Sequence, residues 1–213
     1  MSGMLRIMLV DDHAVVRSGL RRLFELGGSM EVVAEADSGE AAYQLYGEHL
    51  PDVVVMDMSM PGMGGLESLK RILSRYPAAR IVVFSMHETA AFATQALSSG
   101  ARGYVVKSGI ADDLVRAVRD AAAGKTWISP IVAQNIALQT LSGEDDPIRR
   151  LSSREFEVFR LLAEGHPVEG IADMLKISQK TVANYQTLLK QKLGVTSPVE
   201  LVRLAIRHGV IEG

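Results

Sequence analysis

Apolar runs and amphipathic stretches alternate through the first 125 residues of the chain. The runs are nearly continuous, as in residues 53–56, which is typical of strands that are buried on both faces of a sheet. The stretches between them place apolar residues at helical spacing. The pattern predicts strands at 5–10, 32–36, 53–56, 81–84 and 103–106, each followed by a helix. We therefore expect an α/β fold: a five-stranded, parallel, doubly wound sheet with helices on both faces.

From about residue 149 the pattern is helical. Ser152 stands three residues before Glu155, the spacing of a capping box at the start of a helix that ends near Glu164. Further helices are predicted at 168–175, 179–193 and 198–208. A three-residue turn joins the second and third of these four helices, as in a helix-turn-helix. The second domain is thus expected to be all-α, and a small helical bundle that mediates only protein contacts is the alternative.

The segment between the two patterns has the composition of a connection. Residues 127–141 are predicted to form a further helix or arm, with Ser129-Pro130 as its start signal. Residues 142–150 combine glycine, proline and several charges, as linkers do. We place the first domain at 1–125, the helix and linker at 126–148, and the second domain at 149–213.

The composition narrows the class of protein. The absence of cysteine excludes disulfides and thiolate metal sites and suits a reducing cytosol. No apolar run approaches the roughly 20 residues that span a bilayer, so we expect a soluble, cytoplasmic protein with no membrane partner. Residues 149–213 hold 10 Lys and Arg against 7 Asp and Glu, whereas residues 1–148 hold 13 against 18. The second domain is mildly basic, as suits a domain that faces a polyanion.

The residues just past the predicted strands carry the chemistry. Asp11 and Asp12 follow the first strand, Asp57 the third, Ser85 the fourth and Lys107 the fifth. The carboxyl ends of parallel strands lie together and form the ligand crevice. Clustered carboxylates need a cation, and Mg²⁺ binds a few carboxylates while it leaves room for phosphate oxygens. The ammonium and the hydroxyl would then contact a phosphate.

Each of these positions has a plainer interpretation when it is taken alone. Asp12 would be a helix cap, Lys107 a solvated lysine and Ser85 a loop hydroxyl. Because five such residues occur at matched strand ends, a shared site is the better interpretation.

The 179–193 helix is expected to have two faces. The apolar face toward the core holds Val182, Tyr185, Leu188, Leu189 and Leu193. The opposite face holds Lys180, Ala183, Asn184, Thr187, Lys190 and Gln191. This second face is polar and positively charged and has no acid, as suits a helix that enters the major groove of DNA.

Four segments of the first domain carry a resemblance to a known family: LVDDH (9–13), VVVMDMSMPGMGGLE (53–67), VVFSMHE (82–88) and GARGYVVKS (100–108). Together they resemble the receiver domain of bacterial two-component response regulators, which has a flavodoxin-like fold. The resemblance implies that Asp57 accepts a phosphoryl group from a phosphohistidine on a sensor histidine kinase. Such a domain is a phosphoacceptor and not an enzyme, with at most slow autophosphorylation from small phosphodonors and slow autodephosphorylation.

The same resemblance implies roles for the other strand-end residues. The implied Mg²⁺ ligands are Asp11, Asp12, Asp57 and the backbone carbonyl of Ser59. Lys107 would bind the phosphoryl oxygens, and Ser85 would move to do so after transfer. Tyr104 would be the switch aromatic that follows Ser85 inward; from its position alone it is equally well an ordinary packed strand aromatic.

Residues 151–206 resemble the LuxR-type helix-turn-helix of the NarL/FixJ subfamily, through LSSRE, EG, IA, ISQKTV and KLGV. The resemblance implies that the 179–193 helix binds double-stranded DNA through Lys180, Thr181, Ala183, Asn184, Thr187 and Lys190. Because one recognition helix reads few bases, we expect a homodimer on two half-sites when the protein is phosphorylated. RNA polymerase is expected as a further partner. Ala183 and Tyr185 replace a common lysine and a common histidine, departures that bear on the target sequence and not on the mode of binding.

Two other functions compete with a transcription regulator that is switched by aspartyl phosphorylation. A haloacid-dehalogenase-like phosphatase also uses an aspartyl nucleophile with Mg²⁺, but it places a second acid two residues later, where this chain has Ser59. A pseudo-receiver would bind DNA constitutively, and the intact set of strand-end residues argues against it.

Overall fold

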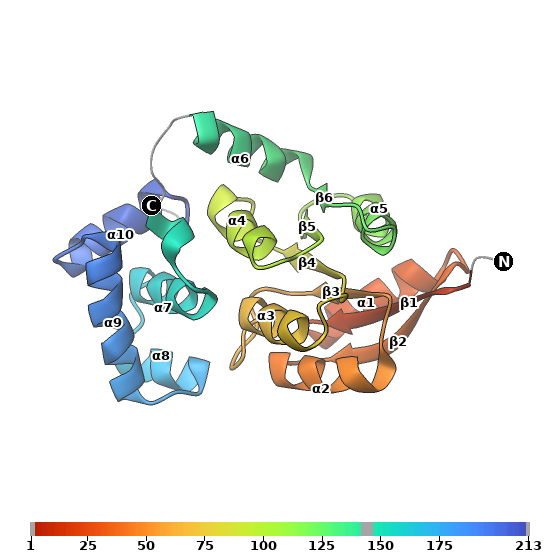
Figure 1. The fold of residues 1–213 in the computed structure, drawn as a ribbon, viewed down its shortest axis with the longest axis horizontal. Helices are drawn as coiled ribbons and strands as arrows, with labels where there is room; N and C mark the ends of the chain where they lie inside the picture. The colour runs from red at the N-terminus through yellow and green to blue at the C-terminus, as the bar shows by residue number, and fades with distance from the viewer. Residues whose placement is uncertain (1–2, 142–146, 212–213) are drawn as a thin grey trace. The chain divides into compact units, whose positions relative to one another are not determined.

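The computed structural model describes residues 3–141 and 147–211, which fall into two compact units (Figure 1). The first consists of residues 1–88 and 96–130, and the second of residues 89–95 and 131–213. Residues 142–146 of the predicted linker lie outside the described residues. None of the helices in the described ranges has the length and apolar character that crossing a bilayer requires.

A parallel sheet lies at the centre of the first unit, with the strand order β2-β1-β3-β4-β5-β6. The strands are β1 (Leu5–Val10), β2 (Met30–Ala36), β3 (Val53–Met56), β4 (Ile81–Ser85), β5 (Gly103–Val106) and β6 (Trp127–Ile128). The predicted α/β class is confirmed, and the five expected strands are present. The helix predicted after Ser129-Pro130 is also present, from Pro130 to Leu141, and the structure adds a sixth strand at the two residues before it. Trp127 and Ile128 add a short edge strand, because they pair with Gly103 and Tyr104 of β5.

Helices cover both faces of this sheet. They are α1 (Ala14–Glu25), α2 (Gly39–His49), α3 (Gly65–Arg75) and α5 (Ala111–Ala122). Helix α4 (Ala90–Ser98) follows β4 and is divided between the two units. Leu9 and Val55 share a core cluster with Phe24 of α1 and Val118 of α5. Because side chains alternate along a strand, the equally buried Met8 points to the opposite face, on which α2 and α3 pack against each other. The result is a doubly wound sheet with a core on each side.

The strand order determines where the site lies. β1 stands between β2 and β3, so the chain reverses its direction of winding next to β1. Val10 is the register partner of Met56, and the backbone N–H of Asp57 donates to the oxygen of Val10 at 2.8 Å. The residues that follow the two strands, Asp11 and Asp57, are therefore neighbours at the carboxyl edge of the sheet.

Gly65 lets α3 begin close to this edge. A Cβ atom at this position would overlap the backbone oxygen of Asp57 and would lie 2.9 Å from the Cα atom of Met58. Only glycine allows the two backbones to approach this closely. The first turn of α3 thus supports the loop that carries Asp57.

The second unit is helical. Besides the first part of α4 it contains α6 (Pro130–Leu141), the 3₁₀ helix η1 (Pro147–Arg150), α7 (Ser153–Ala163), α8 (Val168–Leu175), α9 (Gln179–Leu193) and α10 (Pro198–Arg207). The predicted all-α class is confirmed, and so is the capping box: Ser152 and Glu155 exchange backbone-to-side-chain hydrogen bonds of 3.3 and 2.7 Å. Ser178 caps α9 by accepting from the backbone N–H of Thr181.

The predicted core face of α9 is only partly buried. Val182, Leu189 and Leu193 are buried, and Tyr185 is half-buried. The prediction is wrong for Leu188, whose side chain lies at the surface with a relative exposure of 36%.

Candidate functional site

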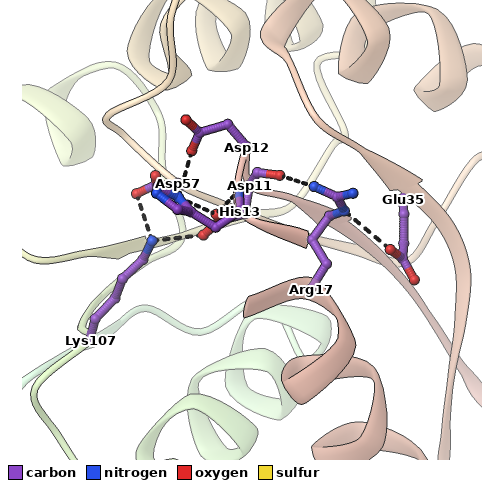
Figure 2. A network of polar contacts seen from close by, with 7 residues as sticks. All are labelled: Asp11, Asp12, His13, Arg17, Glu35, Asp57 and Lys107. Atoms are coloured by element: carbon purple, nitrogen blue, oxygen red, sulfur yellow. Dashed lines mark hydrogen bonds and ion pairs between the residues drawn. The ribbon is translucent and has the colours of Figure 1, made fainter. Parts of the chain in front are cut away.

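Asp57 follows β3 and is held almost out of solvent. Its side chain is 4% exposed, and its carboxylate accepts a backbone hydrogen bond from Ser59. Lys107 follows β5 and places its Nζ atom 3.2 Å from Oδ1 of Asp57 and 2.7 Å from Oδ2 of Asp11 (Figure 2). The ammonium group therefore bridges two buried carboxylates that come from different strands.

Burial and the attraction between Asp57 and Lys107 shift the pKa values of these two side chains in opposite directions. Burial raises the pKa of Asp57, because the carboxylate loses hydration; Lys107 opposes this shift and Asp11 adds to it. Burial alone would lower the pKa of Lys107, but its hydrogen bond to Asp11 and the charge of Asp57 outweigh burial and raise it. The lysine stays charged, and further positive charge at the site would favour the ionised form of Asp57.

Asp12 is the third acid at this edge of the sheet. Its Oδ1 atom is buried and makes no hydrogen bond with the described part of the chain. Nδ1 of His13 lies 2.9 Å from this atom, and a buried carboxylate oxygen is costly unless a positive charge compensates it. Lys107 contacts only two of these three acids, Asp11 and Asp57, so its ammonium does not balance the charge of all three carboxylates. This oxygen-rich, negatively charged set fits Mg²⁺, which takes hard oxygen ligands.

Ser85 and Tyr104 meet at the backbone of His87. Ser85 ends β4, is fully buried, and accepts a hydrogen bond from the N–H of His87 at 3.2 Å. Tyr104 lies on the neighbouring strand β5, is also fully buried, and donates its hydroxyl to the oxygen of His87 at 2.8 Å. Burial raises the pKa of Tyr104 far above its usual value, so this hydroxyl remains a donor.

Residues that the sequence did not single out also surround this site. Nη1 of Arg17 donates to the backbone oxygen of Asp11 at 2.6 Å, while its Nε donates to Oε2 of Glu35 at 3.2 Å (Figure 2). Nε2 of His87 lies 3.3 Å from Oγ of Ser59. The available signals were positional: Arg17 lies five residues after Asp12, and His87 lies two residues after Ser85.

Helix α9 exposes most of the residues that were predicted to contact DNA: Lys180, Ala183, Asn184, Thr187 and Lys190. Thr181 is half-buried, and its hydroxyl shares a hydrogen bond of 2.8 Å with the N-cap Ser178. The hydroxyl of Thr187 donates back to the oxygen of Ala183 at 3.2 Å. The face is accessible, and two of its hydroxyls are engaged within the helix.

Comparison with known families identifies both units. Residues 7–119 match the response regulator receiver domain, and residues 149–205 match the bacterial regulatory proteins of the luxR family. The chain belongs to the two-component response regulators with a LuxR-type DNA-binding domain. This response regulator is 39% identical to the response regulator GacA of Pseudomonas aeruginosa over 211 residues, which is 98% of this chain and 99% of the relative. It is 36% identical to the response regulator UvrY of Escherichia coli over 209 residues, or 97% and 96% of the two chains.

A solved structure supports the same assignment. RcsB from Salmonella enterica serovar Typhimurium, bound to the promoter rprA in the presence of the phosphomimetic BeF₃⁻, matches with a TM-score of 0.71 at 29% identity. The match covers 95% of this response regulator and 98% of that chain. The resemblance found in the sequence is confirmed: this is a DNA-binding response regulator of the LuxR family. Its receiver domain is a phosphoacceptor rather than a classical enzyme, with an acidic cluster typical of a Mg²⁺ site.

Proposed function

We propose that this response regulator controls transcription and is switched by Mg²⁺-dependent phosphorylation of Asp57 by a sensor histidine kinase. The main observation in support of this proposal is that the ammonium of Lys107 bridges the buried carboxylates of Asp57 and Asp11 at the strand ends. The same chain carries the exposed, acid-free face of α9. A reactive carboxylate and a DNA-reading helix in one chain are what a phosphorylation-controlled regulator requires.

Asp57 is the nucleophile in this proposal. One of its carboxylate oxygens attacks the phosphorus of a phosphohistidine: the new O–P bond forms, the N–P bond breaks, and its electron pair returns to the imidazole of the kinase. Lys107 binds the phosphoryl oxygens during transfer, because the protein's contribution is mainly positioning and electrostatics. Mg²⁺ held by Asp11, Asp12, Asp57 and the carbonyl of Ser59 would neutralise charge on the phosphoryl group.

The switch uses the hydroxyls of Ser85 and Tyr104. After transfer, the Ser85 hydroxyl turns from the N–H of His87 to a phosphoryl oxygen, to which it can donate. The backbone N–H of His87 then loses its hydrogen bond to Ser85, and Tyr104, which donates to the oxygen of the same residue, repacks with it. Phosphorylation at Asp57 is thereby transmitted to the segment after β4.

The output is the binding of paired DNA half-sites by a homodimer. One helix in the major groove reads few bases, so two copies on half-sites about one helical turn apart give specificity. RcsB, solved on promoter DNA with a phosphomimetic, supports this assignment by similarity. RNA polymerase is the further partner, and the cytoplasm is the compartment where kinase domain and DNA are both reached.

Mass spectrometry of the intact protein tests the proposal. With acetyl phosphate and Mg²⁺ the wild type is expected to gain one phosphoryl group, and with EDTA to gain almost none. Asp57→Asn should stay unmodified, whereas the control Asp112→Asn, which changes an exposed acid in the first turn of α5, should react as the wild type does. Normal labelling of Asp57→Asn, or equal labelling of the wild type without metal, would refute the assignment.

A further inference from the structure

His13 directly follows the acidic pair and turns its ring toward it. The Nδ1 atom lies 2.9 Å from Oδ1 of Asp12 and 3.2 Å from Oδ1 of Asp11 (Figure 2). One potential ligand atom from each of the three residues thus lies within 4.8 Å of the other two. A nitrogen donor and two oxygen donors converge on one point at the edge of the proposed cation site.

The ring of His13 does not cap the helix that begins after it. His13 is the N-cap of α1, but its side chain makes no capping hydrogen bond. The backbone N–H of His13 already donates to Oδ1 of Asp11 at 2.8 Å, so that oxygen does not depend on the ring for a donor. The ring is two-thirds exposed, which means that packing does not force it against the acids.

The imidazole of His13 contacts both acids: Nδ1 is within ion-pair distance of Oδ1 of Asp12 and within hydrogen-bond distance of Oδ1 of Asp11. Oδ1 of Asp12 makes no hydrogen bond with the described residues although the imidazole nitrogen is 2.9 Å away. A nitrogen and an oxygen at this separation are also spaced as two ligands of one ion are. Adjacent ligands of an octahedral ion, each about 2.1 Å from it, lie about 3 Å apart, and the two distances from Nδ1 match this spacing.

We infer that His13 is a further ligand of the acidic cluster and shifts its preference from Mg²⁺ toward divalent transition-metal ions such as Mn²⁺ and Co²⁺. The inference rests on the proposed function, because it concerns the same cation site. Mg²⁺ prefers oxygen ligands alone, whereas an imidazole nitrogen favours the later first-row ions. With Asp11 and Asp12, His13 supplies one nitrogen and two oxygens.

Pulsed EPR of Mn²⁺ added to the full chain tests this ligand directly. The wild type should show the nitrogen coupling of a bound imidazole, and His13→Asn should lose it while it still binds Mn²⁺ through the acids. Asparagine is a good N-cap, so the start of α1 is preserved. The control His166→Asn removes an exposed histidine that lies 3.4 Å from Glu164, outside the site, and should keep the coupling.

Calorimetric titration of the same variants with Co²⁺ and Mg²⁺ gives a second readout. Even outer-shell partners of a metal contribute about 10–100-fold to affinity, so His13→Asn should weaken Co²⁺ binding at least about tenfold and leave Mg²⁺ binding unchanged. Bound Mn²⁺ without nitrogen coupling, coupling that persists in His13→Asn, or unchanged Co²⁺ affinity would overturn the role of His13 and leave the proposed function standing. A wild type that binds none of the three ions would overturn both.

Discussion

The hydroxyl of Tyr104 donates to the backbone oxygen of His87 at 2.8 Å, and the backbone N–H of the same His87 donates to Oγ of Ser85. The two residues proposed to respond to phosphorylation are therefore joined through one residue before any phosphoryl group is present. Tyr104 is already fully buried in this state. The coupling that we propose thus runs through a hydrogen bond of the tyrosine and does not need the ring to enter from solvent.

Tyr104→Phe should leave the phosphorylation of Asp57 unchanged and weaken the dimerisation that follows it. The ring still fills its place, but the hydrogen bond from the hydroxyl to the oxygen of His87 is lost, which is expected to reduce the free energy of unfolding by about 1 kcal/mol. Labelling of Asp57 by acetyl phosphate should be unchanged, while dimer formation with beryllofluoride and Mg²⁺, measured by light scattering, should weaken. The control is Tyr43→Phe, whose hydroxyl contacts Arg75 at the outside of α2. Equal dimerisation of Tyr104→Phe and wild type would contradict the coupling.

Lys107→Gln should slow phosphorylation and shift its pH dependence. Lys107 lowers the pKa of Asp57 against the raising effect of burial, so its loss should raise that pKa further. Because the ionised carboxylate is the nucleophile, the acidic limb of the rate profile should move to higher pH. At saturating Mg²⁺ the rate should fall on the order of 100-fold, as when one donor to a developing charge is removed. Labelling rates across the acidic range measure both effects, and a limb that stays in place would contradict the role of Lys107.

Gly65→Ala should damage the phosphoacceptor loop. The added methyl group would overlap the backbone oxygen of Asp57, so α3 and the loop must separate. Overpacking of this kind costs about 1–3 kcal/mol, and the displaced Asp57 should be labelled more slowly. Gly19→Ala in α1 is the matched control, because nothing lies within 4 Å of its added Cβ atom. In that helix the change should stabilise by about 0.5–1 kcal/mol, and the comparison is made by urea unfolding.

Most of the first unit could be predicted because its signals are local. Buried parallel strands are continuous apolar runs, and the residues at their ends follow from those runs. β6 could not be predicted in this way, since Trp127 and Ile128 have no periodicity of their own and become a strand only by pairing with the distant β5. The environment of Asp57 was predicted as a set of residue types, but the 2.7 Å contact of Lys107 with Asp11 depends on side-chain directions that a sequence does not give.

In the second unit too, the sequence predicted the elements better than the burial of individual side chains. Spacing placed α7 to α10 and the capping box, but it also assigned Leu188 to the core. A small helical unit buries a narrow stripe, and Val182, Leu189 and Leu193 fill it. His13 and His87 show the same limit at the site, because the sequence indicates where they lie along the chain but not which partners their rings reach.

Glu155 should make the second unit sensitive to acid. Burial alone would raise its pKa, but hydrogen bonds from Lys192 and Ser152 outweigh burial and hold the pKa below its usual value of 4.5. A carboxylate with a lowered pKa in the folded state contributes stability that is present above 4.5 and is lost as the pH falls through the lowered value. Glu155→Gln should remove this part of the acid dependence. Urea titrations followed by amide signals of α7 and α9 measure it, and Glu164→Gln, at an exposed ion pair with Arg160, should keep it.

The last prediction separates base reading from phosphate contact on α9. Asn184 and Lys190 are both exposed on the proposed DNA face, but their side chains suit different partners. An amide can pair with adenine through two hydrogen bonds in the major groove, whereas an ammonium near the end of the helix reaches phosphates.

The two substitutions should therefore weaken DNA binding in different ways. Asn184→Ala should cost about 1–3 kcal/mol at the preferred site and relax one base position, with the salt dependence nearly kept. Lys190→Ala should weaken binding to all duplexes alike and reduce the slope of log affinity against log salt by about 1. Binding isotherms on matched and single-mismatch duplexes over a range of salt concentrations measure both. A uniform loss of affinity in Asn184→Ala would mean that Asn184 is not a base reader, and the reading face would then have to lie elsewhere on the helix.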